Sequence, residues 1–379
     1  MTTESFLGDS SQTLAEERSR RENAKENPVL SVVVIGRNEG ARLVRCLESV
    51  GQMRPLDGPI EIIYVDSGST DGSLERAAQF EVEIKRLESA NPCAASGRNA
   101  GWRASSAPII FFLDGDTVLE PNFVADAIAE LEDPNIAVVF GNRREIDPNA
   151  SIYARVLDRE WIAPAGAVEF CGGDALIRRE VLERVGGFDE RLIAGEEPEM
   201  CRRIRALGFT ILHLDRPMTG HDLAITRFSQ YWRRALRTGY AYAEVSRRFK
   251  NTGLPLWQKE ARGNLIRGAA MLGIVFIAPL ASIAMHSIIP IVALIVVIAA
   301  LAVRTAIRFR WDNVDLITLL LFGLHSHLVH IPLLVGQLKY QCDRLKGSTT
   351  KLIEYKDATV AIPLKDQVKT AKASLSPKS

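Results

Sequence analysis

Two almost uninterrupted apolar segments most constrain how this 379-residue chain can fold. Residues 269–285 and 288–303 contain almost only apolar side chains, and only His286 and Ser287 lie at the junction between the two long runs. A bilayer core about 30 Å thick requires about 20 apolar residues, with a lower limit of about 17. The two segments therefore predict a tight transmembrane hairpin, and a long helix in a soluble core is the alternative.

Basic residues around this hairpin predict its orientation. Three precede it and three follow it, whereas its tip is uncharged: Lys259, Arg262 and Arg267 before, and Arg304, Arg308 and Arg310 after. Because lysine and arginine are retained on the cytoplasmic side, both ends should be cytoplasmic. We therefore expect an integral protein of the inner (plasma) membrane whose preceding domain lies in the cytoplasm.

A third apolar stretch, residues 314–336, conflicts with a simple count of spans. A full crossing would place the basic residues that follow it on the outer side, namely Lys339, Arg344, Lys346 and Lys351. The stretch also contains His325, His327, His330 and Pro332, which are costly against lipid. A re-entrant or interfacial segment would resolve the conflict, and a true third span is the alternative.

Composition limits the remaining possibilities. Residues 1–27 are polar and charged, which predicts a disordered tail, and residues 339–379 are expected to form a cytoplasmic tail. The five cysteines have no paired spacing, so they indicate neither a zinc site nor a disulfide framework, and a reducing compartment is the simpler interpretation. Lysine and arginine (47) balance aspartate and glutamate (46), so overall charge does not favour nucleic acid as a partner.

From Val29 to about Ile211, short apolar runs alternate with amphipathic stretches, a pattern typical of an α/β layer fold. The clearest predicted strands are residues 30–35, 60–65, 109–113 and 136–140. Their apolar residues do not alternate with polar ones, so helices should cover both faces of a mostly parallel sheet. Asn91 with Pro92, and later Pro121, indicate two helix starts with proline at the first helical position.

Two aspartates flank Gly115 directly after the apolar strand at residues 109–113. Ligands bind beyond the carboxyl ends of parallel strands, so Asp114 and Asp116 should stand at the mouth of a crevice. Both carboxylates can bind one hard cation and leave positions for diphosphate oxygens. We therefore expect Mg²⁺ or Mn²⁺ bridging a nucleotide diphosphate. A turn built from Asp and Gly is the structural alternative.

Two further strands end in polar loops, Gly36-Arg37-Asn38-Glu39-Gly40 and Val65-Asp66-Ser67-Gly68-Ser69-Thr70-Asp71-Gly72. Three strands would thus deliver polar loops to one edge of the sheet. A nucleotide site needs such an arrangement, whereas a generic fold does not require it.

In their order along the chain, these motifs resemble those of the family 2 glycosyltransferases, which are inverting enzymes of the GT-A fold. The resemblance covers about residues 29–235 and rests on Asn38-Glu39, Asp66-Ser67-Gly68-Ser69-Thr70-Asp71, Gly97-Arg98-Asn99-Ala100-Gly101, Leu113-Asp114-Gly115-Asp116, Gly187-Phe188-Asp189-Glu190 and Gly195-Glu196-Glu197. It implies a GT-A domain at residues 28–225 and a UDP- or GDP-sugar as donor.

The resemblance also implies roles for particular residues. The donor nucleotide site would comprise Asn38, Glu39, Asp66, Ser67, Asp71, Arg98, Asn99, Asp114 and Gly115. A histidine completes the metal shell in some GT-A enzymes, so Asp114, Asp116 and His221 would hold the metal; a structural role for His221 is the alternative. The acidic pair that supplies the general base is Glu196-Glu197 here, although the family usually has Asp in second place. We assign the base to Glu197; the pair could instead complement a helix N-terminus.

Residues 228–249 predict an amphipathic helix rich in aromatic residues and arginine, within an expected interface region at residues 226–264 that precedes a membrane region at 265–338. Such a helix suits a lipid headgroup layer, but it could equally pack on the catalytic domain with a solvated basic face. The stretch Gln230-Tyr231-Trp232-Arg233-Arg234 lacks the tryptophan after arginine in the Gln-x-x-Arg-Trp motif of processive synthases. Processivity is therefore not inferred.

Taken together, these features predict a metal-dependent inverting glycosyltransferase that moves a sugar to a lipid-linked or polysaccharide acceptor at the cytoplasmic membrane face. One alternative is a synthase that loads sugar onto polyprenyl phosphate, and another is a catalytically inactive membrane scaffold. A nucleotidyltransferase is disfavoured, because Gly36-Arg37-Asn38-Glu39 does not supply the glycine-rich basic signature usual after the first strand of such enzymes.

Overall fold

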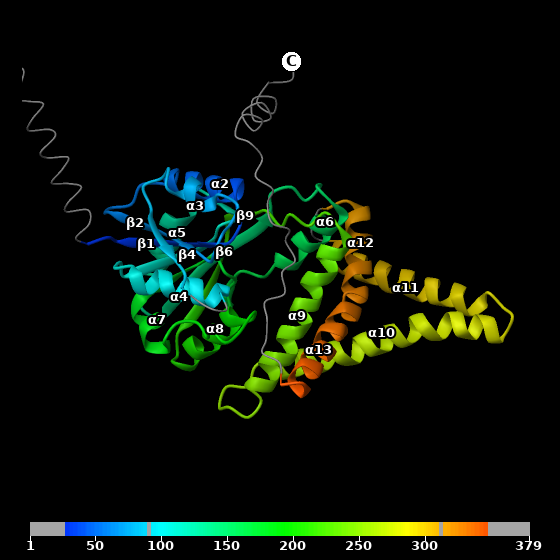
Figure 1. Ribbon diagram of the computed structural model, residues 1–379. Coiled ribbons are helices and arrows are strands. Elements are labelled where there is room, and N and C mark those ends of the chain that lie inside the picture. Colours follow the sequence, from blue (N-terminus) through cyan, green and yellow to red (C-terminus); the bar gives the residue numbers. More distant parts are fainter. Residues whose placement is uncertain (1–26, 89–91, 311–313, 348–379) are drawn as a thin grey trace, which may run out of the picture.

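The computed structural model describes residues 27–88, 92–310 and 314–347, which form an α/β domain followed by a group of long helices (Figure 1). Of the tails predicted at residues 1–27 and 339–379, residues 1–26 and 348–379 lie outside the described residues, as does Asn91 before the predicted helix start at Pro92, whereas residues 339–345 form the end of a helix.

A nine-stranded sheet forms the centre of the α/β domain, with strand order β3-β2-β1-β4-β8-β6-β9-β5 and β7 paired to β9. The strands are β1 (Leu30–Gly36), β2 (Ile60–Asp66), β3 (Glu83–Arg86), β4 (Ile109–Asp114), β5 (Thr117–Leu119), β6 (Ile136–Glu145), β7 (Gly166–Val168), β8 (Ala175–Arg178) and β9 (Thr210–His221). The four predicted strands are β1, β2, β4 and β6, and β6 continues beyond its predicted end.

The pairing of the strands sets the edge at which their loops meet. β1 pairs in parallel with β2 and with β4, β2 pairs in parallel with β3, and β6 pairs in parallel with β9. The predicted parallel sheet is confirmed for these strands, and β8, β5 and β7 add antiparallel pairs. Consequently, the carboxyl ends of β1, β2 and β4 lie at one edge.

Helices cover both faces of the sheet, as the strand composition predicts. The helices of the domain are α2 (Ala41–Gly51), α3 (Ser73–Ala77), α4 (Ala94–Ala104), α5 (Phe123–Glu130), α6 (Ile152–Asp158), α7 (Arg179–Val185) and α8 (Glu196–Ala206), of which α6 packs away from the sheet, against Leu223, Ile225 and Tyr231. Along β1, Val33 and Ile35 join one buried cluster with α4, α7 and α8, whereas Val32 and Val34 join another with α2 and α5. A fully buried strand therefore needs apolar residues at consecutive positions.

Three predicted helix boundaries were wrong. α4 begins at Ala94 and α5 at Phe123, so each starts two residues after its proline rather than on it. In α4 the Ser96 hydroxyl accepts a hydrogen bond from Cys93 N at 3.0 Å, which makes Cys93 the cap. The arginine-rich amphipathic stretch from Met200 to Leu207 predicts a helix start at Met200, but α8 begins at Glu196, so the acidic pair occupies its first turn.

Gly101 lets α4 lie directly on the sheet. A Cβ atom at this position would overlap the Val33 side chain and lie 3.2 Å from Val65 Cγ2. The recurrence of small residues at helical spacing from Ala94 to Ala104 predicts such close packing, and Gly101 confirms it.

Gly101→Ala is expected to destabilise the protein by about 1–3 kcal/mol, because the methyl group overpacks the contact between α4 and β1. Gly51→Ala is the matched control: this helical glycine has open space around its Cβ position, so alanine should be neutral or stabilise by up to about 1 kcal/mol. Thermal unfolding of the purified protein measures both variants. Equal melting temperatures for the two would contradict the packing argument.

Five long helices follow the α/β domain: α9 (Phe228–Arg248), α10 (Gln258–Ala284), α11 (Ile289–Arg308), α12 (Leu316–Leu328) and α13 (His330–Leu345). Figure 1 shows α10 and α11 as a hairpin that projects from the rest, with α9 and α13 side by side. In the described part of the chain, three segments are long and apolar enough to cross a membrane, namely Gln258–Ala284, Ile289–Arg308 and Leu316–Leu345. Their length and composition support association with a membrane.

Candidate active site

The loop after β4 brings Asp114 and Asp116 to the edge where β1 and β2 also end. Gly115 N donates a hydrogen bond to Ile35 O at 2.8 Å, which ties this loop to the end of β1. A Cβ at Gly115 would lie 3.1 Å from the same oxygen, so glycine permits the close approach. Asp114, the last residue of β4, remains partly exposed, whereas Asp116 is buried.

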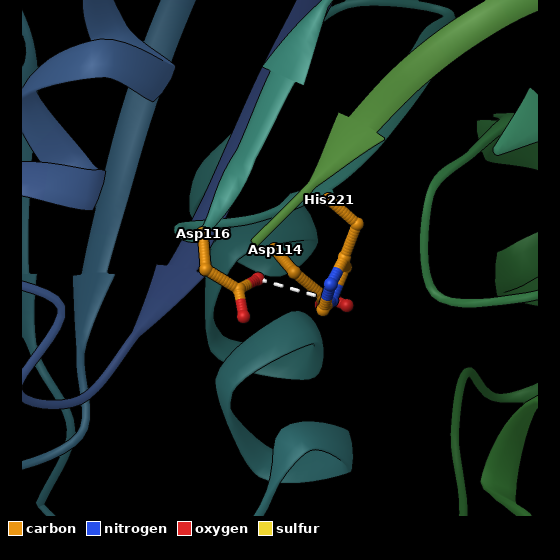
Figure 2. Close-up of side chains that lie close together, drawn as sticks. All are labelled: Asp114, Asp116 and His221. Atoms are coloured by element: carbon orange, nitrogen blue, oxygen red, sulfur yellow. Dashed lines mark ion pairs between the residues drawn. The ribbon is translucent and has the colours of Figure 1, made fainter. Parts of the chain in front are cut away.

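Strand pairing brings His221 to this loop from far along the chain. Thr117, the first residue of β5, pairs with His221, the last residue of β9, and Asp222 N donates to Asp116 O at 3.0 Å. As a result, His221 Nε2 lies 3.3 Å from Asp116 Oδ1 (Figure 2). Asp114, Asp116 and His221 each offer one ligand atom, and these atoms lie within 4.8 Å of one another.

The chemistry of these three side chains fits a divalent metal ion. Burial lowers the pKa of His221 well below its ordinary value, and the nearby Arg143 lowers it further, so the imidazole is neutral and can donate a lone pair. Its Nδ1 is buried and has no hydrogen-bond partner among the described residues. Two carboxylates and a neutral imidazole form a donor set suited to Mn²⁺ or Mg²⁺.

Arg98 connects this cluster to the acidic pair at the start of α8. Its guanidinium is 2% exposed and donates from Nη2 to Asp114 Oδ1 at 2.9 Å. From Nη1 it reaches one oxygen of Glu196 and one of Glu197, each at 3.1 Å. In this structure Arg98 therefore points at three carboxylates, and it fixes the acidic pair relative to Asp114.

Glu197 combines burial with a partly accessible carboxylate, whose side chain is 18% exposed. Burial and the neighbouring Glu196 raise the pKa of Glu197 to about 7, although Arg98 acts in the opposite direction. A carboxylate with this pKa can accept a proton near neutral pH.

The sequence interpretation missed two charged residues of the site, Arg143 and Asp174. Arg143 Nη2 lies 2.6 Å from Asp174 Oδ2 and 3.6 Å from Asp114 Oδ2. Asp174 is buried and accepts hydrogen bonds from Asp114 N at 3.0 Å and from the Thr219 hydroxyl at 2.8 Å. It therefore positions both Asp114 and Arg143.

One signal in the sequence could have identified Asp174: the Gly172-Gly173-Asp174 motif directly before β8. A Cβ at Gly173 would overlap the Arg98 guanidinium and lie 2.9 Å from Asp114 Oδ2. Because Gly173 has no side chain, the backbone can pass close to the ion pair of Arg98 and Asp114. Arg143 also lies over the Trp161 ring at 5.7 Å, and that ring lies 5.1 Å from the ring of His221.

The loops after β1 and β2 lie at the predicted edge and are tied to each other. Asn38 Oδ1 accepts from Thr70 N at 2.8 Å, and Ser67 N donates to Gly36 O at 2.9 Å. Asp66 Oδ2 accepts from two amides of its own loop, at 3.0 Å and 2.9 Å. Asp71 Oδ1 accepts from Ser73 N at 3.1 Å.

Glu39, at the same edge, pairs with Arg42 at 2.9 Å. The predicted donor residues of these two loops, Asn38, Glu39, Asp66, Ser67 and Asp71, are therefore brought together as expected. In this structure the side chains of Asn38, Glu39, Asp66 and Asp71 all have protein partners.

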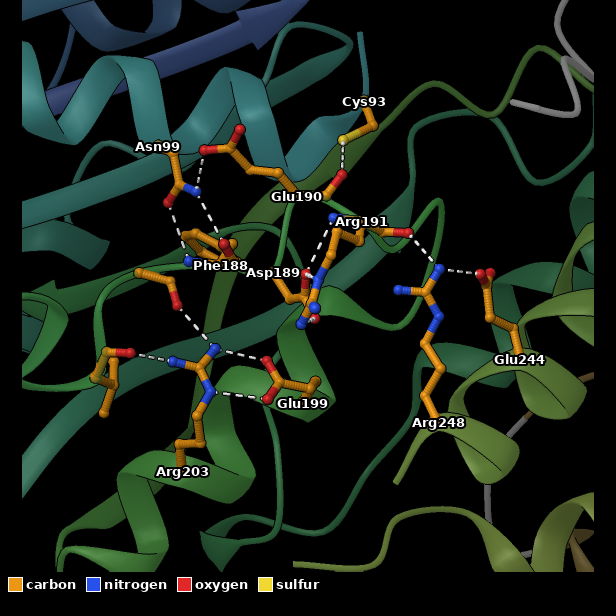
Figure 3. Close-up of polar contacts among 12 residues, drawn as sticks. Cys93, Asn99, Phe188, Asp189, Glu190, Arg191, Glu199, Arg203, Glu244 and Arg248 are labelled. Carbon is orange, nitrogen blue, oxygen red and sulfur yellow. Dashed lines mark hydrogen bonds and ion pairs between the residues drawn. The ribbon is translucent and has the colours of Figure 1, made fainter. Parts of the chain in front are cut away.

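Asn99, which the resemblance assigns to the donor site, has protein partners for its whole side-chain amide. Its side-chain amide donates to Phe188 O at 2.9 Å and to Glu190 Oε1 at 2.7 Å, and it accepts from Phe188 N at 3.0 Å (Figure 3). It also accepts from Trp102 Nε1 at 3.0 Å. These four bonds use the full capacity of the amide, and Asn99 is 1% exposed. In this structure it attaches the Gly187–Glu190 loop to α4, and a contact between Asn99 and the donor stays a prediction.

The third acidic residue of α8 is also structural. Glu199 accepts two hydrogen bonds from Arg203, one of them at 2.8 Å from Nε, and Arg203 also donates to Gly187 O at 2.8 Å (Figure 3). Glu196 and Glu197 face Arg98 instead. Of the three carboxylates in the first turn of α8, Glu199 therefore helps to hold the loop at Gly187, whereas Glu196 and Glu197 belong to the candidate active site.

The sheet order, the carboxylates after β4 and the histidine at the end of β9 define a domain of the GT-A class, which handles nucleotide-activated sugars. Residues 31–186 match the family described as Glycosyl transferase family 2, and residues 109–308, more than half of the chain, match Glycosyl transferase family group 2. The chain belongs to the family 2 group of glycosyltransferases.

Individual relatives agree with this assignment. Glycosyltransferase AglE of Haloferax volcanii is 27% identical over 195 residues, which cover 48% of this chain and 64% of the relative. Validoxylamine A glucosyltransferase of Streptomyces hygroscopicus is 29% identical over 220 residues, with 48% and 49% covered. This chain thus spans about half to two thirds of the length of these curated relatives.

A solved structure confirms the fold. The mannosyltransferase PcManGT from Pyrobaculum calidifontis, determined with GDP-Man and Mn²⁺, superposes with a TM-score of 0.55 at 20% identity. The superposition covers 79% of this chain and 87% of that structure. The GT-A prediction is therefore confirmed at the level of the fold.

Proposed function

We propose that this protein transfers a sugar from a nucleotide diphosphate sugar to a hydroxyl group, with inversion and with a bound divalent metal ion. The observation that carries the proposal is the side-by-side placement of the Asp114, Asp116 and His221 cluster and the Glu197 carboxylate, joined through Arg98. A donor held by the first group would thus meet a base in the second.

Each part of the site has a distinct task in this proposal. Asp114, Asp116 and His221 would hold Mn²⁺ or Mg²⁺, which when bound neutralises charge on the diphosphate leaving group. Glu197 accepts the proton of the acceptor hydroxyl as that oxygen attacks the anomeric carbon, and the nucleoside diphosphate leaves from the opposite side. Arg98 keeps Glu197 and Asp114 in fixed relation, and Asp174 does the same for Asp114 and Arg143.

The polar loops after β1 and β2 supply the remaining contacts to the donor, which we propose to be a UDP- or GDP-sugar. A fold shared with a structure that contains GDP-Man and Mn²⁺ supports such a donor. The acceptor is proposed to be a lipid-linked or polysaccharide glycan at the cytoplasmic face of the membrane, since apolar helices follow the catalytic domain directly. The proposed units are the catalytic domain at residues 28–225, interface helices to 264 and membrane helices to 338.

A donor screen tests this function. Membranes containing the protein would be incubated with UDP- and GDP-sugars in the presence of Mn²⁺, Mg²⁺ or a chelator, and released nucleoside diphosphate would be measured. At least one donor should be consumed with either metal and spared with the chelator. Chelator-resistant turnover would contradict the metal site, and no turnover with any donor would favour the inactive scaffold.

Glu197 should give the reaction a pH dependence near neutrality. A base acts in its deprotonated form, and because the pKa of Glu197 is raised to about 7, the active fraction falls as the pH falls below that value. We expect kcat/KM for a hydroxyl acceptor to decrease about tenfold per pH unit below about pH 6 and to level off above about pH 8. Initial rates across this range measure the profile, and a profile flat below neutrality would exclude Glu197 as the base.

A further inference from the structure

The packing of α9 against α13 decides where the third apolar segment lies relative to the bilayer. We propose that α12 and α13 lie along the membrane surface, on the same side as the catalytic domain, and that only the α10–α11 hairpin enters the lipid. This inference rests on the proposed membrane association and is independent of the proposed chemistry.

α9 and α13 touch backbone to backbone at two points. A Cβ at Gly239 of α9 would overlap Leu333 O, and a Cβ at Gly336 of α13 would overlap Leu236 O. Near these contacts the rings of Tyr240 and Tyr340 pack edge to face, with centroids 5.2 Å apart. The two helices therefore occupy the same depth relative to any membrane.

Arginines attach α9 to the catalytic domain. Arg237 Nη2 donates to Ile193 O at 2.9 Å. Arg248 Nη2 donates to Arg191 O at 3.0 Å, as Figure 3 shows. Because an arginine and the polar loop that it binds are costly in hydrocarbon, α9 stays at the level of the catalytic domain. α13 must then stay there as well.

α12 is attached to the same domain through His325. This histidine is 7% exposed; its Nε2 lies 3.0 Å from Glu160 Oε1, and its Nδ1 lies 2.8 Å from the Tyr231 hydroxyl. Glu160 belongs to the short Arg159–Trp161 helix of the catalytic domain and also pairs with Arg234 at 2.8 Å. A carboxylate of the catalytic domain thus reaches α12 near its C-terminal end.

The ionisation of Glu160 makes a lipid location for this contact still less favourable. Burial favours the neutral acid, but Arg234 and His325 outweigh burial and lower the pKa of Glu160 to about 2. The carboxylate is therefore charged at neutral pH, and a charged carboxylate is excluded from the hydrocarbon core. His325, which would be costly against lipid if α12 were part of a third span, is therefore paired with Glu160 of the catalytic domain.

The α10–α11 hairpin differs from α12 and α13 because most of its apolar side chains are exposed. Gly268 of α10 still contacts α13, since a Cβ there would overlap His330 O. Beyond it, α10 and α11 expose large apolar side chains such as Phe276 (62%) and Ile283 (71%). In the most apolar part of each segment, only 17% of the residues of α10 and 11% of those of α11 are buried, compared with 44% for Leu316–Leu345. The hairpin therefore has lipid as its partner, whereas the third segment already has protein.

The native cysteines provide a direct test. Cys342 in α13 is exposed, whereas Cys46, Cys93, Cys171 and Cys201 are buried, so a membrane-impermeant maleimide should report on Cys342. Three variants in a Cys342→Ser background extend the test: Lys346→Cys after α13, Arg103→Cys on the exposed surface of the catalytic domain, and Ser287→Cys at the tip of the hairpin. Labelling would be compared in intact cells and in inverted vesicles.

We expect Cys342 and the cysteines at 346 and 103 to react in the same preparation, and the cysteine at 287 to resist the reagent from that side. Reaction of residue 346 only from the side opposite residue 103 would show a third crossing and overturn the inference. Reaction of residue 287 from the same side as residue 103 would show that the hairpin does not enter the lipid. Release of the protein by alkaline carbonate would overturn membrane insertion itself, while leaving the donor assay unaffected.

Discussion

Asp116→Asn is expected to slow release of nucleoside diphosphate by at least about 10²-fold, the size of effect seen when one group that stabilises developing charge is removed. Asp116 is 4% exposed, and its Oδ1 lies 3.3 Å from His221 Nε2 in the candidate metal cluster. Asparagine keeps the shape of the side chain but removes the charge that binds a cation. Turnover measured over a range of Mn²⁺ concentrations should show both a lower rate and weaker activation by the metal.

Asp126→Asn is the matched control for this variant. Asp126 is a surface carboxylate of α5, 40% exposed, and its ion pairs are with Arg54 at 3.5 Å and Arg216 at 3.9 Å rather than with a residue of the cluster. Its loss should leave both turnover and metal activation unchanged. If Asp116→Asn retained the parent rate and metal dependence, the proposed metal site would be wrong.

Glu197→Gln is expected to reduce transfer to a hydroxyl acceptor by about 10²–10⁴-fold, the usual contribution of a general base. Glutamine is nearly isosteric, and Arg98 retains Asp114 and Glu196 as ionic partners, so the fold should persist. Product formation with the donor found in the screen measures the effect, and a circular dichroism melting curve confirms that the variant is folded.

The acceptor used with Glu197→Gln separates the two enzymatic hypotheses. A phosphate acceptor is already ionised and needs little help from a base, so sugar transfer to polyprenyl phosphate should survive the change. Full activity of the variant on polyprenyl phosphate, with no activity of the parent on hydroxyl acceptors, would replace the proposed function with the polyprenyl-phosphate sugar synthase. Glu83→Gln, a change of an exposed carboxylate on edge strand β3, is the control and should leave both activities intact.

Strand positions and the edge that carries the site could be predicted because they depend on local sequence. Consecutive apolar residues in β1, β2 and β4 indicate strands buried on both faces, and the polar residues that follow each strand must then lie at one edge of a parallel sheet. Asp114 and Asp116 are therefore found where they are expected.

The partners of these residues depend on contacts between distant segments. The sequence offers no spacing rule for the pairing of Thr117 with His221, or for the ion pairs of Arg143 with Asp174 and Arg98 with Glu197. The partners of Asn99 were likewise not predicted from the sequence. Its motif implies a contact with the donor nucleotide, whereas in the structure its side-chain amide holds the Gly187–Glu190 loop. The predicted helix starts at Pro92 and Pro121 were each two residues too early. The first residue of a helix depends on the backbone conformation of several neighbouring residues, and a proline alone does not determine it.

By itself, the sequence determined the α/β class, the edge with the carboxylates and the presence of an apolar hairpin, because burial in a sheet or in lipid requires runs of apolar residues that can be read directly. Resemblance to the family suggested His221 as the third ligand. Only the tertiary structure decided which strand pairing brings it to the two aspartates, and that Arg98 connects them to Glu197. It also attached His325 to Glu160, so that an apolar segment which composition alone marks as a span has a charged protein partner. Such outcomes follow from close packing of residues about a hundred or more positions apart, where register and side-chain geometry, rather than composition, select the partner.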